Sequence, residues 1–169
     1  LRYGTFGSNS VDNLHPVMRE NNWSTRNLVL AGNFNLTNVD ELFEALLDLG
    51  QYPKDYSDTV TMLEKVGHFL DKENQSLFDH YKQKGYTNRD ITELIANNLD
   101  ITKILYNSSK RWDGGFAVAG MMGHGDVFAI RDPWGIRAAY YYFDDFSVKK
   151  LVDCDLCPCV QHGLESVIV

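Results

Sequence analysis

The sequence predicts an α/β (α+β) protein with a helical middle third followed by mostly antiparallel strands. Apolar residues recur at helical spacing between about residues 39 and 105. From Gly114 the chain becomes rich in aromatic and β-branched residues, which glycine-containing turns separate. A short apolar run at residues 27–33 adds a strand before the helices. No internal repeat or low-complexity linker divides these parts, so they belong to one unit.

Composition and charge limit the class of partner. The 169 residues are 44% hydrophobic and 23% charged, as in a soluble globular domain with a real core. The formal net charge is −7 and the basic residues are scattered, so no basic surface for nucleic acid is expected. No apolar run is long enough to span a bilayer. We therefore expect a cytoplasmic protein that binds neither nucleic acid nor membrane.

An asparagine-rich stretch, AGNFNLTN at residues 31–38, follows the apolar run. Turn-forming residues after a buried strand predict that the strand ends near Asn33 and that a loop follows. Asn38, with Glu41 three positions later, then predicts the start of a helix that ends at Gly50. The apolar face of this helix consists of Val39, Leu42, Phe43, Leu46 and Leu47.

Three further helices are expected before the strands. The second begins at Ser57 or Asp58 and the third, a short one, ends at Gly85. Thr87 opens the fourth, which continues toward residue 105. Their apolar stripes are Val60, Leu63, Val66, Phe69 and Leu70, then Leu77, Phe78 and Tyr81, then Ile91, Leu94, Ile95, Ile104 and Leu105. GHG and DPWG are expected to be turns between the strands that follow.

Three polar features could carry chemistry. Arg2, in the RYGTFG stretch, could bind a carboxylate with two parallel hydrogen bonds, or it could be an ordinary exposed arginine. Asn33 and the N–H groups after it could stabilise a developing negative oxygen, or Asn33 could simply end a strand. Asp58 could hold an ammonium group, or it could only cap a helix.

Taken in order, RYGTFG, AGNFNLTN, SDT, DGGFAVAGM and RDPWGIR resemble the glutamine amidotransferase domain of the amidophosphoribosyltransferase family. Members read roughly R-Y-S-T-x-G, H-N-G-N-L-T-N, D-T-E and R-D-P-x-G-I-R-P, and the resemblance extends over about residues 1–143. It implies a class II domain with an N-terminal nucleophile and an Ntn-hydrolase-like αββα sandwich of two mostly antiparallel sheets. Residues 1–147 would form this domain without its N-terminal strands, and residues 148–169 a divergent tail.

The resemblance also implies roles for individual residues. Arg2, with Thr5 in the same turn, would bind the α-carboxylate of L-glutamine, and Asp58 its α-ammonium group. The side-chain amide of Asn33 and the backbone N–H of Phe34 would form the oxyanion hole for the tetrahedral intermediate. The family's nucleophile is the thiol of an N-terminal cysteine, whose own α-amine acts as the base.

The product of such a domain is ammonia, which a separate phosphoribosyltransferase domain adds to phosphoribosyl diphosphate in purine biosynthesis. No signature of that second domain is visible in the chain, so it would be a separate partner. The resemblance implies Mg²⁺ in the phosphoribosyltransferase domain and no cofactor in this one. Missing first strands would expose sheet edges, so self-association, as a homo-oligomer, is expected.

Several departures from the family pattern bear on activity. The chain begins at Leu1 without an initiator methionine, and its first residues already read as a strand running into a loop, so we expect a missing upstream segment. No cysteine lies near the start, so we expect no glutamine hydrolysis by the chain as given. Phe34 replaces a glycine, which would cost about 1 to 2 kcal/mol if the position requires positive φ. Gly32 replaces a histidine and Val60 a glutamate. A non-catalytic module that binds glutamine or another amino acid, or that regulates, is therefore the alternative.

Other polar motifs are expected to be structural. In RDPWGIR, an Arg–Asp pair should brace a tight turn around Asp132. His15 and His124 are single histidines in turns without partner spacing, and solvent exposure is expected for both.

The tail contains the remaining candidate ligands. Cys154, Cys157, Cys159 and His162 have the chemistry of zinc ligands, but nine residues with a central proline strain a tetrahedral site. We expect no metal there, and a small zinc-binding interaction protein is the third reading of the chain.

Overall fold

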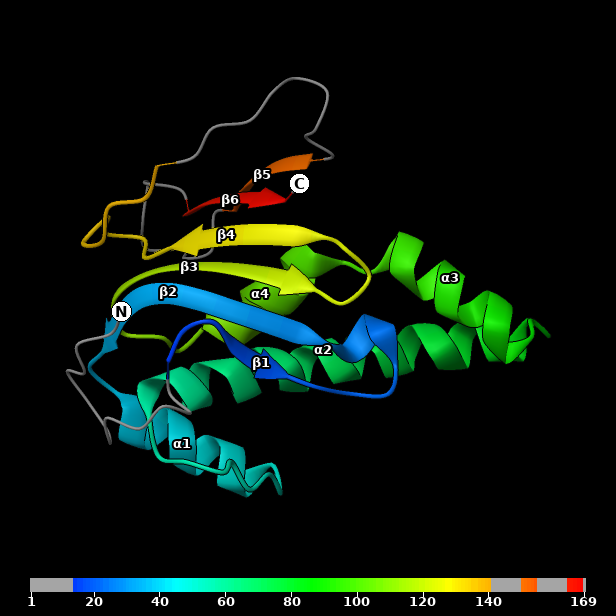
Figure 1. Cartoon of the computed structure of the whole chain (residues 1–169), viewed down its shortest axis with the longest axis horizontal. Coiled ribbons are helices and arrows are strands. Elements are labelled where there is room, and N and C mark those ends of the chain that lie inside the picture. The colour runs from blue at the N-terminus through cyan, green and yellow to red at the C-terminus, as the bar shows by residue number, and fades with distance from the viewer. Residues whose placement is uncertain (1–13, 141–149, 155–163, 169) are drawn as a thin grey trace.

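The computed structural model describes residues 14–140, 150–154 and 164–168, the last two segments by their backbone (Figure 1). Its elements are β1 (Val17–Arg19), a 3-10 turn η2 (Ser24–Arg26), β2 (Leu28–Leu36), α1 (Val39–Asp48), α2 (Asp58–Gln83), α3 (Asn88–Asn98), α4 (Ile101–Ser109), β3 (Gly114–Met122), β4 (Val127–Arg131), β5 (Lys150–Cys154) and β6 (Leu164–Ile168). The predicted α/β class is confirmed.

The described strands form one antiparallel sheet in the order β1-β2-β3-β4-β6-β5. β5 and β6 lie in the segment that the sequence separates as a tail, and their backbones extend the sheet beyond β4. The second sheet of the expected sandwich is not among the described strands.

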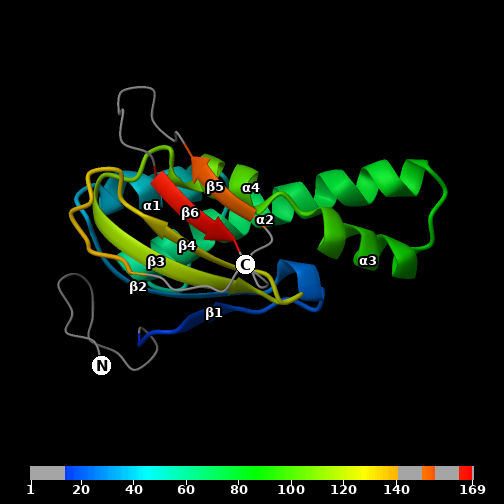
Figure 2. The same cartoon turned by 90° about the horizontal axis from the view of Figure 1, so that it is seen from above.

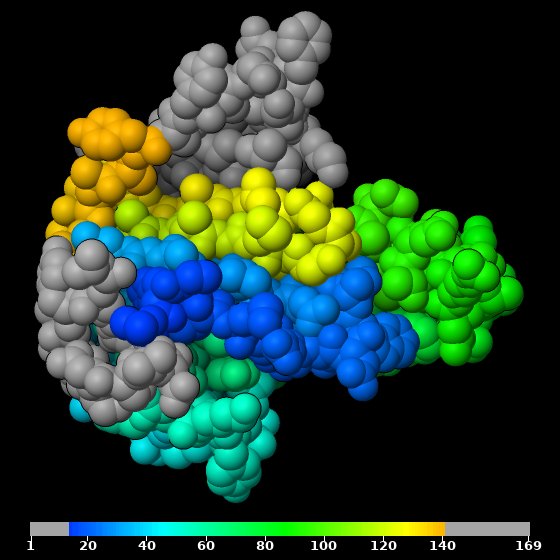
Figure 3. All heavy atoms as spheres, viewed as in Figure 1, coloured from blue at the N-terminus to red at the C-terminus, as the bar shows by residue number. Residues whose placement is uncertain are grey.

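Helices cover one face of this sheet (Figures 1 and 2). α2 runs beneath β1 and β2, and its C-terminal half projects with α3 beyond the sheet, as a lobe that is also visible in the space-filling view (Figure 3). The core lies between the helices and the sheet, because alternate residues of β2 and β3 turn toward the helices and are buried. Its members include Leu28, Leu30, Leu42, Met62, Val66, Leu70, Ile104, Leu105, Phe116, Val118, Phe128 and Ile130.

The predicted loop at the asparagine-rich stretch is wrong. β2 continues through Asn33 and Phe34 to Leu36, and it pairs with β3 over its whole length. The alternation of the stretch explains this result, since Asn33 and Asn35 are exposed on one face while Phe34 lies on the other. Close strand pairing depends on a glycine in β3: a Cβ on Gly114 would lie 2.3 Å from the carbonyl oxygen of Asn35.

The predicted helical region is correct, but the predicted breaks between its helices are partly wrong. The first expected helix is α1, but the second and third are one continuous helix, α2. The polar residues at 71–76 contain no glycine or proline, and the buried Asn74 donates to the carbonyl oxygens of Leu70 and Thr25 there. The fourth expected helix is divided into α3 and α4, because the Asp100 side chain accepts the Lys103 N–H and starts a new helix.

Arg19 connects β1 to α2. Its guanidinium pairs with Glu64 (3.3 Å) and with Asp71 (2.5 Å), which lie two turns apart on α2. Burial alone would lower the pKa of Arg19, but the hydrogen bonds and charges of these carboxylates raise it above its ordinary value. Gly67 lies between the two carboxylates, and a Cβ there would come within 2.6 Å of Cδ and Nε of Arg19. The glycine therefore makes room for the arginine to cross the helix.

Candidate functional site

Three segments meet at one edge of β2: the residues just before β1, the middle of β2, and the first turn of α2. Their contacts form a chain of polar groups that runs from Gly32 through His15 and Thr59 to Asp58. Because Gly32 and Asp58 belong to two motifs that the sequence singles out, the fold brings those motifs together.

Asp58 is buried, with 1% of its surface exposed, at the start of α2. Ser57 is the N-cap, and its hydroxyl oxygen accepts the Val60 N–H at 3.2 Å. The carboxylate of Asp58 accepts the Thr59 N–H at 2.8 Å and lies 3.3 Å from the Thr59 hydroxyl. The free N–H groups and partial positive charge of a helix N-terminus favour a carboxylate at this position. The prediction that Asp58 lies at a helix start is confirmed, whereas its contact with an ammonium group stays a prediction.

His15 contacts both β2 and the first turn of α2. Its Nδ1 accepts the Gly32 N–H at 3.2 Å, and its Nε2 lies 3.4 Å from the Thr59 hydroxyl oxygen. The imidazole also stacks on the Phe34 ring, with centroids 5.2 Å apart and an interplanar angle of 27°. The expectation that His15 is a solvent-exposed histidine without partners is therefore wrong.

The backbone N–H of Phe34 points toward the same edge of β2. In an antiparallel ladder, successive N–H groups of one strand point alternately toward its two neighbours. The Gly32 N–H points away from β3, toward His15, and Phe34 lies two residues farther on. The cross-strand partner of Phe34 is Phe116, whose N–H donates to the Asp132 carboxylate at 3.3 Å and whose carbonyl oxygen accepts the Asp132 N–H at 2.7 Å. Because both backbone groups of Phe116 point toward Asp132, Phe34 and Phe116 do not hydrogen-bond to each other.

Phe34 occupies this position without backbone strain. No non-glycine residue in the described part of the chain has positive φ, so the penalty considered for a bulky residue at position 34 does not apply. The ring packs against the hydrophobic core in addition to His15. A Cβ on Gly32 would lie 3.1 Å from a Phe34 ring carbon and 2.5 Å from the carbonyl oxygen of Ala117.

The structure separates the other predicted residues from this edge or does not describe them. The Asn33 side chain is exposed on the face of the sheet opposite the helices, because it is one residue out of phase with Gly32 and Phe34. Arg2 and Thr5 lie outside the described residues. Sequence reasoning missed His15 because its partners Gly32 and Thr59 are 17 and 44 residues away, so no local spacing indicates the contact.

Asp132 has a structural role, as expected, although its partners differ from the expected arginine. Its carboxylate accepts the N–H groups of Phe116 (3.3 Å), Ile136 (2.8 Å) and Arg137 (3.0 Å), and 1% of the residue is exposed. It fastens the turn after β4 to β3 through backbone groups. His124 was also expected in solvent, but its side chain is 6% exposed and pairs with Asp126 at 3.2 Å.

Two basic residues of α2, Lys65 and His68, lie outside the polar chain. Burial lowers the pKa of Lys65, and the charge of Arg111 lowers it further. Burial also lowers the pKa of His68, with Lys65 and Lys72 contributing, while Nδ1 of His68 lies 3.1 Å from the amide nitrogen of Gln51.

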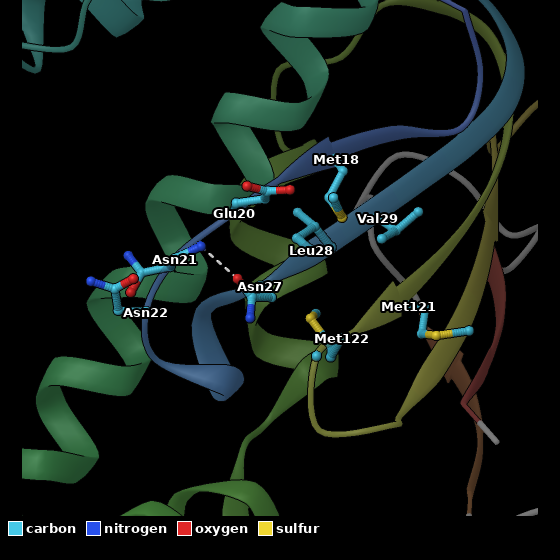
Figure 4. A pocket seen from close by; sticks show the side chains of 10 residues that line it. Met18, Glu20, Asn21, Asn22, Asn27, Leu28, Val29, Met121 and Met122 are labelled. Carbon is cyan, nitrogen blue, oxygen red and sulfur yellow. Dashed lines mark hydrogen bonds between the residues drawn. The ribbon is translucent and has the colours of Figure 1, made fainter.

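A separate groove lies at the other end of β2 (Figure 4). It has a volume of about 550 Å³ and is lined by Met18, Val29 and Met121 of the strands and by asparagines of the β1–β2 connection. The N–H of Asn21 donates to the side-chain oxygen of Asn27 at its rim. None of the predicted site residues lines it, so the groove and the polar chain are separate places.

Within the described part of the chain, no group of three or more histidine, cysteine or acidic side chains could hold a metal ion. The side chains of Cys154, Cys157, Cys159 and His162 lie outside that part. Among the described helices, none is both long and apolar enough to cross a membrane.

Comparisons with known proteins agree with the motif resemblance at the level of the fold. No protein-family model matches the sequence, and no curated protein does. Among solved structures, glutamine phosphoribosylpyrophosphate (PRPP) amidotransferase from B. subtilis, complexed with ADP and GMP, matches with a TM-score of 0.52 and 22% identity, over 81% of this chain and 23% of that chain. A structure described as the allosteric regulatory enzyme of purine biosynthesis matches with a TM-score of 0.53 and 20% identity, over 99% of this chain and 26% of that one.

At such identities the similarity concerns the fold alone, and this chain spans about a quarter of the length of the chains it matches. The resemblance that the motifs predict is thereby confirmed for the architecture: the protein has the fold of one part of a PRPP amidotransferase.

Proposed function

We propose that the protein carries a class II glutamine amidotransferase domain of the PRPP amidotransferase type, which binds L-glutamine and cleaves its side-chain amide. One observation carries this proposal. The buried carboxylate of Asp58 and the N–H of Phe34 lie toward one edge of β2, connected through Thr59 and His15. These are the two groups that the motif resemblance assigns to opposite ends of the substrate, the α-ammonium group and the reacting amide.

Each residue has a defined task in the proposed reaction. Asp58 binds the α-ammonium group, because a buried carboxylate gains most from a cationic partner. Arg2 and Thr5 bind the α-carboxylate. The Phe34 N–H stabilises the negative oxygen of the tetrahedral intermediate, whereas the Asn33 amide, the second donor that the motif resemblance implies, lies on the outer face of the sheet and would have to turn toward this edge.

The reaction itself needs a nucleophile. In a domain of this type a cysteine thiolate attacks the amide carbon, and the tetrahedral intermediate collapses to a thioester as its C–N bond breaks and ammonia leaves. Water then cleaves the thioester and yields glutamate and the free thiol. The enzyme to be tested must therefore have its natural N-terminus.

The wider assembly follows from the same proposal. Small apolar residues cover the face of the sheet away from the helices, among them Val29, Ala31, Ala119 and Ala129. A second sheet packed on this face would complete the αββα sandwich. A phosphoribosyltransferase domain, containing the Mg²⁺, would use the ammonia for purine biosynthesis in the cytoplasm, while this domain would need no cofactor. Pairing of exposed strand edges would favour a homo-oligomer.

The deciding experiment measures glutamine-dependent ammonia release by the protein with its natural N-terminus. Asp58→Asn should raise KM about tenfold or more, because a neutral amide binds ammonium less tightly than a carboxylate does. Asp79→Asn is the matched control, since Asp79 is exposed farther along the same helix and bonds only to Gln75 among the contacts described. Equal KM values for the two variants would contradict the assignment of Asp58.

A second candidate is a non-catalytic module that binds glutamine. It is favoured by the straight course of β2 through Asn33 and Phe34, which directs the Asn33 amide away from the edge where Asp58 lies. Calorimetry separates the candidates, because such a module would bind L-glutamine without releasing ammonia.

A further inference from the structure

We infer that His15 and Thr59 form a positioning pair that fixes the Asp58 carboxylate relative to the Phe34 N–H, so that they set the affinity for the ammonium end of the ligand. This inference rests on the proposed function and goes beyond it, because the motif resemblance assigns no role to either residue. His15 lies in the segment before β1, and Thr59 is the second residue of α2.

The direction of each hydrogen bond follows from the chemistry of the groups. A backbone N–H can only donate, so Nδ1 of His15 must accept from Gly32. The neutral imidazole then carries its proton on Nε2 and can donate it to the Thr59 hydroxyl oxygen, 3.4 Å away. The Thr59 hydroxyl in turn can donate to the carboxylate of Asp58 at 3.3 Å. Every donor in the chain therefore meets an acceptor.

Packing holds the chain in place. Thr59 and Asp58 are each 1% exposed, so their polar atoms are costly to leave without partners. The imidazole of His15 is fixed on a second side by stacking on Phe34. Since the same ring contacts the Gly32 N–H, the Phe34 ring and Thr59, it sets the distance between β2 and the first turn of α2.

Thr59→Val is the sharpest variant. Valine has nearly the shape of threonine and leaves the Thr59 backbone N–H on Asp58, so the substitution removes only the hydroxyl between His15 and the carboxylate. Thr61→Val is its matched control: Thr61 is 0% exposed in the same helix turn, and its hydroxyl has no hydrogen-bond partner within the described part of the chain.

His15 is tested by two variants that separate stacking from hydrogen bonding. His15→Phe keeps an aromatic ring against Phe34 but has neither acceptor nor donor. His15→Gln offers one acceptor and one donor in a flexible side chain, so it should restore part of what His15→Phe loses. Thermal unfolding of each variant shows that it is folded before binding is compared.

Binding is measured by calorimetry with two probes, L-glutamine and the same molecule without its α-amino group, 4-carbamoylbutanoate. We expect Thr59→Val and His15→Phe to weaken L-glutamine binding roughly tenfold, as for loss of one hydrogen bond to a charged group, and His15→Gln to weaken it less. Affinity for the probe without the amino group should change less than twofold, which a merely structural defect would not reproduce. Thr61→Val should change neither.

Four results would overturn the inference. Equal losses for both probes would show a general defect, and an unchanged L-glutamine affinity in folded Thr59→Val would show that the pair does not position Asp58. A nitrogen chemical shift that places the His15 proton on Nδ1 would contradict the hydrogen-bond directions, whatever the ligand. If the wild-type protein does not bind L-glutamine at all, the proposed function itself fails, and the inference fails with it.

Discussion

Replacing Gly67 with alanine should have opposite effects on the free energy of unfolding in the wild type and in a variant without the Arg19 side chain. In an exposed helix, replacing glycine with alanine raises the free energy of unfolding by about 1 kcal/mol. At Gly67 the added Cβ would lie 2.6 Å from Cδ and Nε of Arg19 and 3.0 Å from Cζ. All three atoms belong to a flexible side chain, so the overlap can be relieved if Arg19 leaves its place between Glu64 and Asp71.

The magnitude follows from the exposure of the ion pairs. The Arg19 side chain is 18% exposed, and those of Glu64 and Asp71 are 27% and 30% exposed, so the pairs are stronger than surface pairs and weaker than buried ones. Their loss should cost about 2 kcal/mol. Gly67→Ala should therefore lower the free energy of unfolding by about 1 kcal/mol in the wild type. In an Arg19→Ala background it should raise it by about 1 kcal/mol.

Urea unfolding of the four proteins, followed by circular dichroism and tryptophan fluorescence, measures this coupling directly. Ser76→Ala, at an exposed position of the same helix, serves as the control and should have the same small effect in both backgrounds. If Gly67→Ala changes stability equally in the two backgrounds, the steric conflict with Arg19 is not the reason for the glycine.

Three other predictions concern ionisable side chains described above. Asp132→Asn should lower the free energy of unfolding by about 2 kcal/mol, because the amide nitrogen cannot accept the backbone N–H hydrogen bonds that a carboxylate oxygen now accepts. The affinity for L-glutamine should stay unchanged in this variant. Lys65→Met should raise the free energy of unfolding by about 1 kcal/mol at pH 7, since burial lowers the pKa of Lys65 and so opposes its charge; lower stability would contradict this. Because burial lowers the pKa of His68 below 6.5, this group favours folding above that pH, and its contribution is lost as the pH falls from 6.5. His68→Gln should flatten the dependence of unfolding free energy on pH below 6.5, and an unchanged slope would refute the assignment.

Local patterns predicted the elements that local interactions build. The apolar stripe of α1, the start of α2 at Asp58 and the turn between β3 and β4 follow from periodicity, capping and glycine, which operate within a few residues. The course of β2 was mispredicted because asparagines are turn formers by propensity, whereas pairing with β3 decides the conformation. The continuous length of α2 likewise depends on packing of its polar middle, where the buried Asn74 connects to Thr25.

The candidate site shows the same division. The neighbours of Asp58 in the sequence placed it at a helix start, and the order of the motifs indicated that the stretch around Gly32 and Phe34 belongs to the same site. The contact between them could not be predicted, since it passes through His15, whose partners are distant in sequence. The alternation of faces that removes Asn33 from this edge also became clear only when the strand was seen to continue.

The close contact around Gly32 bears on how this sequence can change. The H-N-G pattern of the resembled family has histidine and glycine at the positions that correspond to 32 and 34, whereas this chain has glycine at position 32 and phenylalanine at position 34. A histidine restored at position 32 alone would meet the backbone of β3, since even a Cβ comes within 2.5 Å of the Ala117 oxygen. A glycine restored at position 34 alone would remove the ring that packs on His15. Neither single step is favourable, and replacing Phe34 as well would not free position 32, because the Ala117 oxygen belongs to the backbone; a side chain at position 32 would require β3 to shift away from β2.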